Sequence, residues 1–443
     1  MDFGKEKITV LFGKIFFPTL AGMLSTCAVT AADGIFVGRG IGGDGIAAVN
    51  ICVPLLMFFT GLSLMTGIGG SVIASIALSK GKIKRARFNV TQSMLFAAAI
   101  ATAFVAVILM FPNETAAMLG ASEHLRDMVV TYLVWFVPAL VFLVCGIASM
   151  FYIRLDGAPK LAMWCNIIPA VLNAFLDWLF IFPFQWGVMG AAFASSLSVF
   201  AGGIIAVAYL QFFAKNVRFY PLKIGVRGFH LFFENIWSQC RIGSSALMGE
   251  ATMAMLMFVG NQVFMRYLGD DGVAAFGVCC YYMPFVFMVG NAIAQSAQPV
   301  ISFNYGLNNR QRTIEAEKVA LTTAVFFGAL ATGVFALFPA SAVGLFLDPS
   351  EPAARLAAEG FPYFAAGFAC FILNLTGIGY FQSVERLAPA TVFAVLRGGA
   401  FLLPAFYFMP VLAGTAGIWL AMPVSETATF LAMIAYFLIK KRY

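Results

Sequence analysis

The chain has 443 residues, of which 61% are hydrophobic and only 11% are charged, and its mean hydropathy is +0.91. Soluble domains carry about 25% charged residues, so this composition excludes a soluble globular protein. The formal net charge of +7 does not indicate nucleic-acid binding, because the basic residues are spread over alternate loops and form no single patch.

Apolar runs recur along the whole chain, and each has about the 20 residues that a helix needs to cross a hydrocarbon core of about 30 Å. We therefore predict an all-α polytopic membrane protein with twelve transmembrane helices. The predicted spans are 10–37, 46–79, 88–112, 125–153, 160–183, 187–214, 236–266, 273–304, 314–338, 353–381, 388–411 and 414–439. The first apolar segment is too long for a signal peptide, so we expect this helix to stay in the mature protein.

The loop charges predict the orientation of the spans. Basic residues concentrate before span 1, in the loops after the even-numbered spans and at the C-terminal end, whereas most acidic loop residues fall in the other loops. By the positive-inside rule both termini are cytoplasmic, as an even number of spans requires. We expect an integral protein of the bacterial cytoplasmic (inner) membrane.

An internal repeat divides the chain into two halves. Gly42–Ala48 reads GGDGIAA and Gly269–Ala275 reads GDDGVAA, while Gly187–Ser198 and Gly414–Ser425 form a second similar pair that is separated by the same interval in the numbering. An interval that spans an even number of helices keeps their direction, so the repeats are parallel. We predict two pseudo-symmetric six-helix bundles, residues 1–214 and 236–443, joined by a cytoplasmic linker at 215–235.

The residues that usually carry enzyme chemistry are sparse. Eight cysteines and two histidines show no metal-ligand spacing, and no Ser-His-Asp or Cys-His arrangement is evident. We predict that the protein is not an enzyme and has no cofactor, and that its cysteines are small buried hydrophobic residues.

Four carboxylates interrupt the apolar runs, namely Asp33, Asp177, Glu250 and Glu426. A charged side chain at the centre of a bilayer costs about 2.5–3.5 kcal/mol on insertion scales, and such residues usually line an ion or substrate path. At the equivalent position of the other repeat each of them corresponds to an uncharged residue, so the symmetry of the chain does not account for them. Their positions predict a transporter.

In the first half, Asn173 and Asp177 lie on one stripe of span 5, at a depth similar to that of Asp33 in span 1. With Ser195 of span 6 they would form an oxygen-rich cluster that binds Na⁺ or shares a proton. The alternative is a hydrogen-bonded polar contact between helices. Pro18 removes a hydrogen bond from span 1 and predicts a bend there, either a moving or a static one.

In the second half, Glu250 and Glu426 fall near mid-membrane, with Arg397 at a similar depth. These residues predict proton coupling or the docking of a cationic substrate, or else a structural ion pair between Arg397 and one of the acids. The 48 Phe and 21 Met residues mostly face lipid or pack helices. A minority in a cavity would suit lipophilic and cationic ligands.

Several segments together resemble the multidrug and toxic compound extrusion (MATE) family. They are Asp33-Gly34 with the following GGDGIAA, the stretch NAFLDWLFIF that contains Asn173 and Asp177, the stretch WGVMGAAFAS, AQPVISFNYG at 297–306, and GIWLAMPVSE at 417–426. The resemblance covers essentially the full chain and is closest to the prokaryotic DinF-like branch.

The resemblance implies two six-helix lobes arranged as a V that export amphipathic or cationic small molecules in exchange for H⁺ or Na⁺. It assigns ion coupling to Asp33, Asn173, Asp177 and Ser195, which together are a possible Na⁺ site, and helix bending to Pro18. It also implies a role in the second lobe for Glu250, whereas spans 10 and 11 lack the acid that some Na⁺-linked members carry. We expect a monomer, because one chain already encloses a cavity.

Two other functions compete with this one. A flippase of lipid-linked oligosaccharide or cell-wall precursors belongs to the same superfamily and needs a cationic cavity, for which Arg39, Arg241 and Arg397 are candidates. The mostly acidic interior and the twelve spans argue against it. A channel or a membrane scaffold would not account for asymmetric acids in a symmetric repeat.

Overall fold

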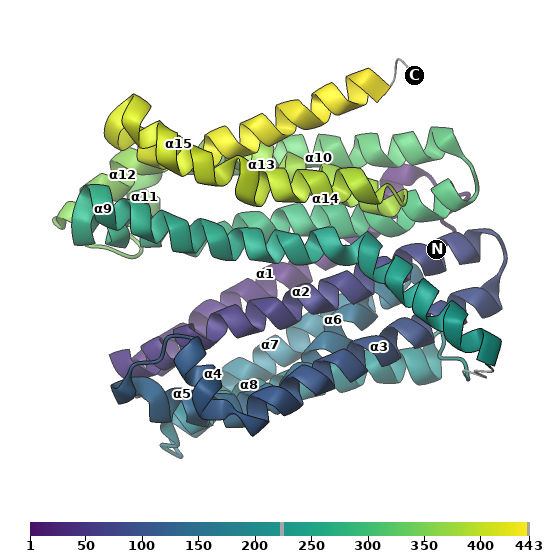
Figure 1. Cartoon of the computed structure of the whole chain (residues 1–443), viewed down its shortest axis with the longest axis horizontal. Coiled ribbons are helices and arrows are strands. Elements are labelled where there is room, and N and C mark those ends of the chain that lie inside the picture. The colour runs from purple at the N-terminus through teal and green to yellow at the C-terminus, as the bar shows by residue number, and fades with distance from the viewer. Residues whose placement is uncertain (222–225, 441–443) are drawn as a thin grey trace. The chain divides into compact units, whose positions relative to one another are not determined.

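The computed structural model describes residues 1–221 and 226–440, and within these ranges it consists of helices without a strand (Figure 1). The helices of the first half are α1 (Ile8–Gly40), α2 (Gly43–Ser79), α3 (Ile83–Met110), α4 (Pro112–Met118), α5 (Glu123–Phe136), η1 (Val137–Ala139), α6 (Leu140–Leu155), α7 (Pro159–Ile181), α8 (Gly187–Ala208) and η2 (Tyr209–Phe213). Those of the second half are α9 (Val226–Gly306), α10 (Arg310–Leu337), α11 (Pro339–Val343), α12 (Pro352–Ala365), α13 (Phe368–Ser383), α14 (Leu387–Val395), η3 (Leu396–Ala400) and α15 (Leu402–Lys440).

The helices in the described part of the chain confirm the prediction of an all-helical protein with twelve spans. Nine continuous helical segments are long and apolar enough to cross a membrane, and the pair α12 and α13, bent by 43°, forms a tenth. Two of the nine are double spans: α9 breaks at Gly269, and the segment from α14 to α15 breaks at Gly414. Counting both halves of each brings the number to twelve.

The breaks occur at equivalent places in the two repeats. Gly42 and Gly269 both have positive φ, at 97° and 65°, and so do Gly187 and Gly414, at 57° and 58°. L-residues with a Cβ rarely adopt these backbone angles, so glycine ends one span and lets the next begin within a residue or two. The repeat in the sequence is therefore also a repeat of backbone conformation.

Two other turns extend this correspondence. Gly81 and Asn308 are separated by the same interval as the two glycine pairs and have φ values of 70° and 57°. Gly157 and Glu385, whose separation is one position longer, have φ values of 89° and 54°. The second repeat thus has the same turns with Asn308 and Glu385 in place of glycine. A positive φ is less strained for asparagine than for glutamate.

Within single spans the helix geometry also departs from the regular form. The fourth span passes through the 3₁₀ turn η1, which contains Pro138, and the tenth bends between α12 and α13. The sixth and eleventh spans contain the π-helical segments η2 and η3. Such π segments often occur at functional sites, and η3 carries Arg397.

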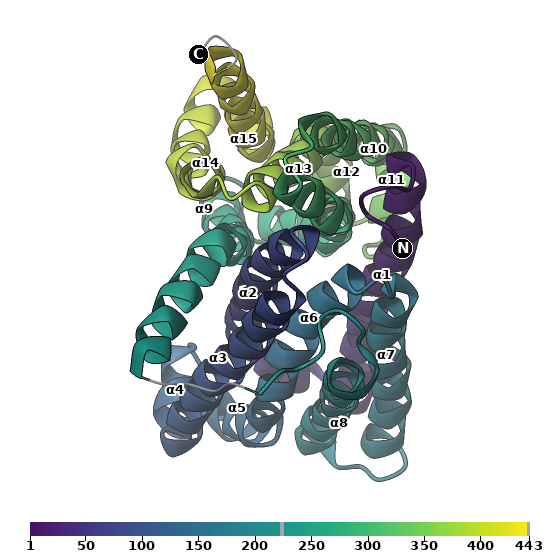
Figure 2. The same cartoon turned by 90° about the vertical axis from the view of Figure 1, so that its right-hand side faces the viewer.

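The chain forms two compact units. The first consists of residues 1–6, 13–247 and 302–309, and the second of residues 7–12, 248–301 and 310–443. In the first unit α6 and α8 pack on each other and on their neighbours α2 and α7 (Figure 2). In the second unit α13 packs on α10, α14 and α15. The division into 1–214, 215–235 and 236–443 stays a prediction, and residues 222–225 of its linker lie outside the described residues.

Adding a methyl group at Gly269, where α9 breaks, tests whether the turn between these spans requires glycine. Gly269 has φ 65° and ψ −156°, a region that is essentially restricted to glycine, so Gly269→Ala should lower the unfolding free energy by about 1–3 kcal/mol. Thermal unfolding in detergent measures the change. Gly277→Ala is the matched control, because Gly277 lies in the same helix with open space around its Cβ position. Equal melting temperatures for the two variants would contradict the prediction.

Candidate functional site

The first unit brings Asp33 and Asp177 together. Asp33 lies half-buried in α1 and Asp177 lies fully buried in α7, and the two carboxyl groups are close enough to share a hydrogen bond when one is protonated. No protein group donates to the buried Asp33 Oδ1 or to either carboxylate oxygen of Asp177 among the described residues. Three of the four carboxylate oxygens of this pair therefore have no protein donor within the described ranges.

Polar side chains from α5, α7 and α8 complete this cluster. The amide of Asn173 in α7 donates to the hydroxyl of Ser195 in α8, with a distance of 3.4 Å between Nδ2 and Oγ. The hydroxyl of Tyr132 in α5 is in hydrogen-bonding contact with Ser195 and lies near both carboxyls. The four residues predicted for this site are thus neighbours, and Tyr132 is a fifth member.

A pair of desolvated carboxylates has a simple electrostatic requirement. Two unit charges 4 Å apart repel by about 4 kcal/mol at an effective dielectric constant of 20, and desolvation adds to this cost. One proton or one small cation removes most of the repulsion. The oxygens of Asp33, Asp177, Ser195, Asn173 and Tyr132 are all hard ligands of the kind that Na⁺ accepts, so the chemistry of this cluster suits either ion.

The cluster differs from a resident metal centre. No group of three or more His, Cys, Asp or Glu residues that could hold a metal ion occurs in the described part of the chain. Only two charged ligands meet here, and hydroxyls and an amide supply the remaining oxygens.

Pro18 lies inside α1, fifteen positions before Asp33. Because proline lacks a backbone N–H, α1 has one unpaired carbonyl about one turn before it. α1 is nevertheless a continuous helix from Ile8 to Gly40. The role of Pro18 in bending stays a prediction, and the missing hydrogen bond lies in the same helix as Asp33.

In the second unit, Arg397 and Glu426 form a buried ion pair. The Nε of Arg397 donates to Glu426 Oε1 at 2.7 Å, and the exposed fractions of the two side chains are only 1% and 4%. The amide of Asn374 donates to Glu426 Oε2 and to the Glu426 carbonyl, both at 2.8 Å. The guanidinium also lies 4.0 Å from the ring centre of Phe371. Of the sequence-based alternatives for Arg397 and Glu426, this geometry matches the structural ion pair.

Glu250 has a different environment. It lies in α9 and is 8% exposed, and no basic side chain of the described residues lies within ion-pair distance of it. Arg397 is already neutralised by Glu426. Of the two acids predicted for this unit, Glu250 is therefore the one without a protein counterion among the described residues.

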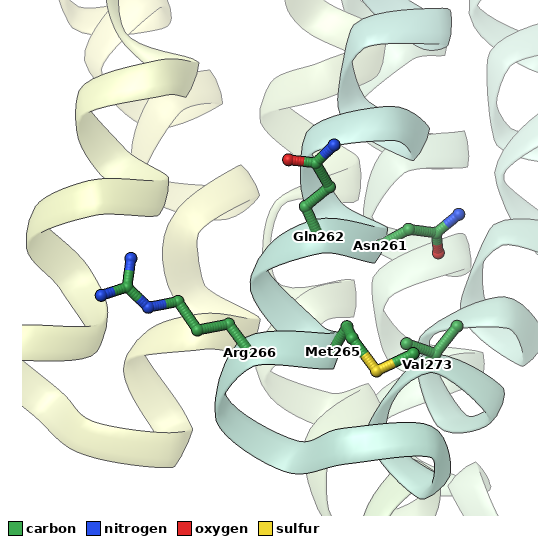
Figure 3. Close-up of a pocket in the computed structure, with 5 residues that line it drawn as sticks. All are labelled: Asn261, Gln262, Met265, Arg266 and Val273. Carbon is green, nitrogen blue, oxygen red and sulfur yellow. The ribbon is translucent and has the colours of Figure 1, made fainter.

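A shallow pocket of about 380 Å³ lies where the first span of α9 ends (Figure 3). Its lining consists of Asn261, Gln262, Met265, Arg266 and Val273. Figure 3 shows that these side chains diverge, with Arg266 and Gln262 directed away from Met265 and Val273. A binding site needs polar groups that converge on the ligand, so this pocket is not a candidate substrate site.

Three site residues were not predicted from the sequence. Tyr132 lies among apolar residues of the fourth span, Asn374 in the tenth span was not singled out, and Phe371 is one of 48 phenylalanines. Asn374 carried the one usable signal, because it is an amide within an apolar run. Nothing in the sequence distinguishes Tyr132 or Phe371 from residues that only fill the core.

Within the described residues, twelve apolar spans in two repeats, with buried carboxylates that have no protein donor, define the class of integral membrane transporters. The family model MatE matches residues 18–179 and 246–405, which is more than half of the chain. The chain therefore belongs to the MATE family, as its motifs suggested; the assignment to the DinF-like branch stays a prediction.

Relatives and solved structures agree with this assignment. The multidrug export protein MepA of Staphylococcus aureus (strain MSSA476) is 24% identical over 453 residues, covering 99% of this chain and 96% of the relative. An outward-facing multidrug resistance MATE family transporter superposes with a TM-score of 0.91, at 18% identity and coverage of 98% and 96%. A mutant of the Vibrio cholerae MATE transporter VcmN superposes with a TM-score of 0.89, at 18% identity and coverage of 98% and 97%.

The ion pair predicts a strong asymmetry between single and double variants. Arg397→Met or Glu426→Leu alone should lower the unfolding free energy by about 3–5 kcal/mol, because each leaves a buried charge without its partner. The double variant should recover much of the loss, since no buried charge remains. Thermal unfolding of all four proteins in detergent measures this coupling. Additive losses in the double variant would show that the pair does not act as a unit.

Proposed function

We propose that the protein is a secondary active antiporter that exports lipophilic or cationic small molecules in exchange for inward H⁺ or Na⁺. The observation that carries the proposal is the pair of Asp33 and Asp177, two adjacent carboxyls whose buried oxygens lack protein donors. Such a pair holds one cation more favourably than none, so its occupancy responds to the concentration of the ion on the side to which it is open.

Binding of the ion is coupled to transport through the helices that carry the site. Neutralising the pair removes a repulsion between α1 and α7 and changes which arrangement of the two helices is favoured. Pro18 gives α1 a place where bending costs little, because one backbone hydrogen bond is already missing. The ion gradient thereby supplies the free energy for moving a second molecule against its own gradient.

The exported molecule is proposed to interact with the second unit through Glu250. Its carboxylate has no basic partner among the described residues and can therefore interact with a positive group of the substrate. Arg397 and Glu426 neutralise each other and serve the packing of α13, η3 and α15. The relatives named as multidrug exporters support the choice of substrate class.

The same ion pair argues against the flippase alternative. A lipid-linked pyrophosphate needs uncompensated positive charge in the cavity, but Arg397, the buried candidate, is already bound to Glu426. Arg39 and Arg241 are exposed and lie near the ends of their predicted spans. We place the exporter in the bacterial cytoplasmic membrane as a monomer with both termini in the cytoplasm.

The coupling site is tested by efflux of a fluorescent lipophilic cation from proteoliposomes under imposed pH or Na⁺ gradients. Asp33→Asn and Asp177→Asn should each abolish gradient-driven efflux, because the amide cannot carry the charge that the ion neutralises. The gradient that drives the wild type identifies the ion. Asp44→Asn is the matched control, since Asp44 is exposed and pairs with His124, and it should transport normally. Efflux that persists in both site variants would overturn the coupling role.

A second variant separates substrate binding from ion coupling. Glu250→Gln should raise the concentration of the cation needed for half-maximal efflux by about tenfold, which corresponds to about 1.4 kcal/mol, while the variant keeps the ion dependence of the wild type. An uncharged lipophilic substrate should be unaffected, because it makes no use of the carboxylate. Equal losses for the charged and uncharged substrates would assign Glu250 to the structure of the second unit.

A further inference from the structure

The linker that follows η2 is fixed to the end of α6. The Oδ2 of Asp156 accepts from the Tyr209 hydroxyl and from the backbone N–H of Lys215, both at 2.9 Å, and its Oδ1 accepts from the backbone N–H of Asn216 at 2.7 Å. Both carboxylate oxygens are thus engaged by η2 and by the start of the linker. Asp156 therefore holds the chain in place where the sixth span ends.

The same linker then runs beside the first turns of α3. Arg87 donates from Nη2 to the Lys215 carbonyl at 2.6 Å, and the backbone N–H of Tyr220 donates to the Thr91 hydroxyl at 2.9 Å. Arg87 and Thr91 are four positions apart and so lie on one face of α3. Residues 215–220 therefore lie along that face of the helix.

Four cations gather where the linker meets α3. Lys84 lies one turn before Arg87 on the same face of α3, and Lys215 and Arg218 belong to the linker. The side chains of Lys84, Lys215 and Arg218 are exposed. Arg218 donates from Nε to the Gln211 carbonyl at 2.8 Å, which holds it against η2. We call Lys84, Arg87, Lys215 and Arg218 the basic surface.

Protein acids do not neutralise the basic surface. No Asp or Glu occurs in α3 or in residues 209–221, and the two oxygens of Asp156 already accept from η2 and the linker. Among residues 1–221 and 226–440, none of the four cations is part of an ion pair. The Nε of Arg87 is buried and has no protein acceptor within these ranges. The basic surface therefore has an excess of positive charge that an external anion can neutralise.

The repeat does not account for these charges. The turn from α9 to α10 is the counterpart of the turn from α2 to α3, and Gly306 before the one packs on Ser79 before the other without room for a Cβ. In the second half, the positions equivalent to the two cations of α3 are occupied by Gln311 and Ile314. The positive-inside rule requires basic residues in these loops but does not require them on one face. Their shared position therefore points to a ligand.

Two phenylalanines add an apolar part to the basic surface. Phe212 and Phe213 lie in η2, directly before the linker, and are 64% and 71% exposed. A soluble anion would make use of the cations but not of these rings. In a phospholipid the phosphate lies at the level of basic side chains and the acyl chains begin just below it, which matches exposed rings beside cations at the end of a span. The combination favours a phospholipid over a soluble anion.

We propose that the basic surface binds the headgroups of anionic phospholipids in the leaflet that the loop charges predict to be cytoplasmic, with Phe212 and Phe213 among the first carbons of the acyl chains. This site goes beyond the proposed function, since it involves neither the coupling ion nor the exported molecule. A phosphate that accepts from cations of both α3 and the linker strengthens the contact between them. Anionic lipid thereby stabilises this end of the first unit.

Lipid binding to the whole protein tests the site. Phosphatidylglycerol is titrated into the protein in a neutral detergent and its binding is followed by native mass spectrometry, with phosphatidylcholine of the same chain length as the neutral lipid. Lys84→Gln/Lys215→Gln should weaken the binding of phosphatidylglycerol about tenfold and leave that of phosphatidylcholine unchanged, because only the anionic headgroup makes use of the charges.

The variant should keep the fold, since only the backbone of Lys215 takes part in the hydrogen bonds that hold the linker. Lys318→Gln/Arg386→Gln is the matched control, because it removes two exposed cations of the second unit. Equal affinities of the two variants for phosphatidylglycerol would overturn the site.

A second comparison separates a lipid from a soluble anion of the same chemistry. An excess of inorganic phosphate at constant ionic strength should not displace phosphatidylglycerol, and Phe212→Gln/Phe213→Gln should weaken its binding although the cations are intact. Phe326→Gln/Phe338→Gln is the control, because these rings of the second unit are exposed to a similar extent, 63% and 60%. Displacement of the lipid by phosphate, or equal binding by the two aromatic variants, would overturn the proposal. Neither measurement depends on transport, so the outcome is independent of the proposed function.

Discussion

The structure depends on how the carboxylates buried in its apolar interior are neutralised. The chain meets that need in two ways: Arg397 and Glu426 neutralise each other, and Asn374 donates to the second oxygen of the carboxylate. Asp33 and Asp177 have no such partner among the described residues, and in the proposed function an ion from outside the protein neutralises them. The first arrangement fixes the packing of three helices, whereas the second, as proposed, makes the stability of the pair α1 and α7 depend on ion concentration. Both arrangements therefore depend on neutralising a buried carboxylate. The counter-charge is an arginine in the ion pair and, in the proposed function, a transported ion at Asp33 and Asp177.

The repeat supplies the framework on which this asymmetry is placed. Positive-φ residues recur at equivalent positions in three pairs of turns and one position out of register in a fourth, so both halves begin and end their spans at corresponding places. The charged residues do not follow the repeat, since each of the four acids within the spans corresponds to an uncharged residue at the equivalent position of the other half. Duplicated backbone and unduplicated charge give one chain two similar bundles with different chemistry, to which we assign different tasks: ion binding to the first and substrate binding to the second.

Much of this architecture could be predicted from the sequence. Apolar runs of membrane length locate all twelve spans, and the motifs GGDGIAA and GDDGVAA mark two equivalent breaks, because glycine at a positive φ leaves a local signature. The proximity of Asp33 and Asp177 was also predictable, since ionisable residues within spans are rare. Tyr132 and Phe371 were not, because an aromatic residue in a chain rich in Phe and Tyr carries no mark of its neighbours. The pairing of Arg397 with Glu426 in preference to Glu250 likewise depends on the packing of η3, which no local pattern encodes.

Ser79 and Gly306 occupy equivalent positions of the two repeats, so the serine that ends α2 packs on its own repeat counterpart at the end of α9. In an assembly of two identical chains, such a contact would set one residue type against itself, and two serines would not fit where a Cβ on one side already meets the other helix. Fusion of the two halves into a single polypeptide removes that restriction. Each side of the contact can then be substituted independently, so a serine can stand opposite a glycine where two identical chains would have to set glycine against glycine.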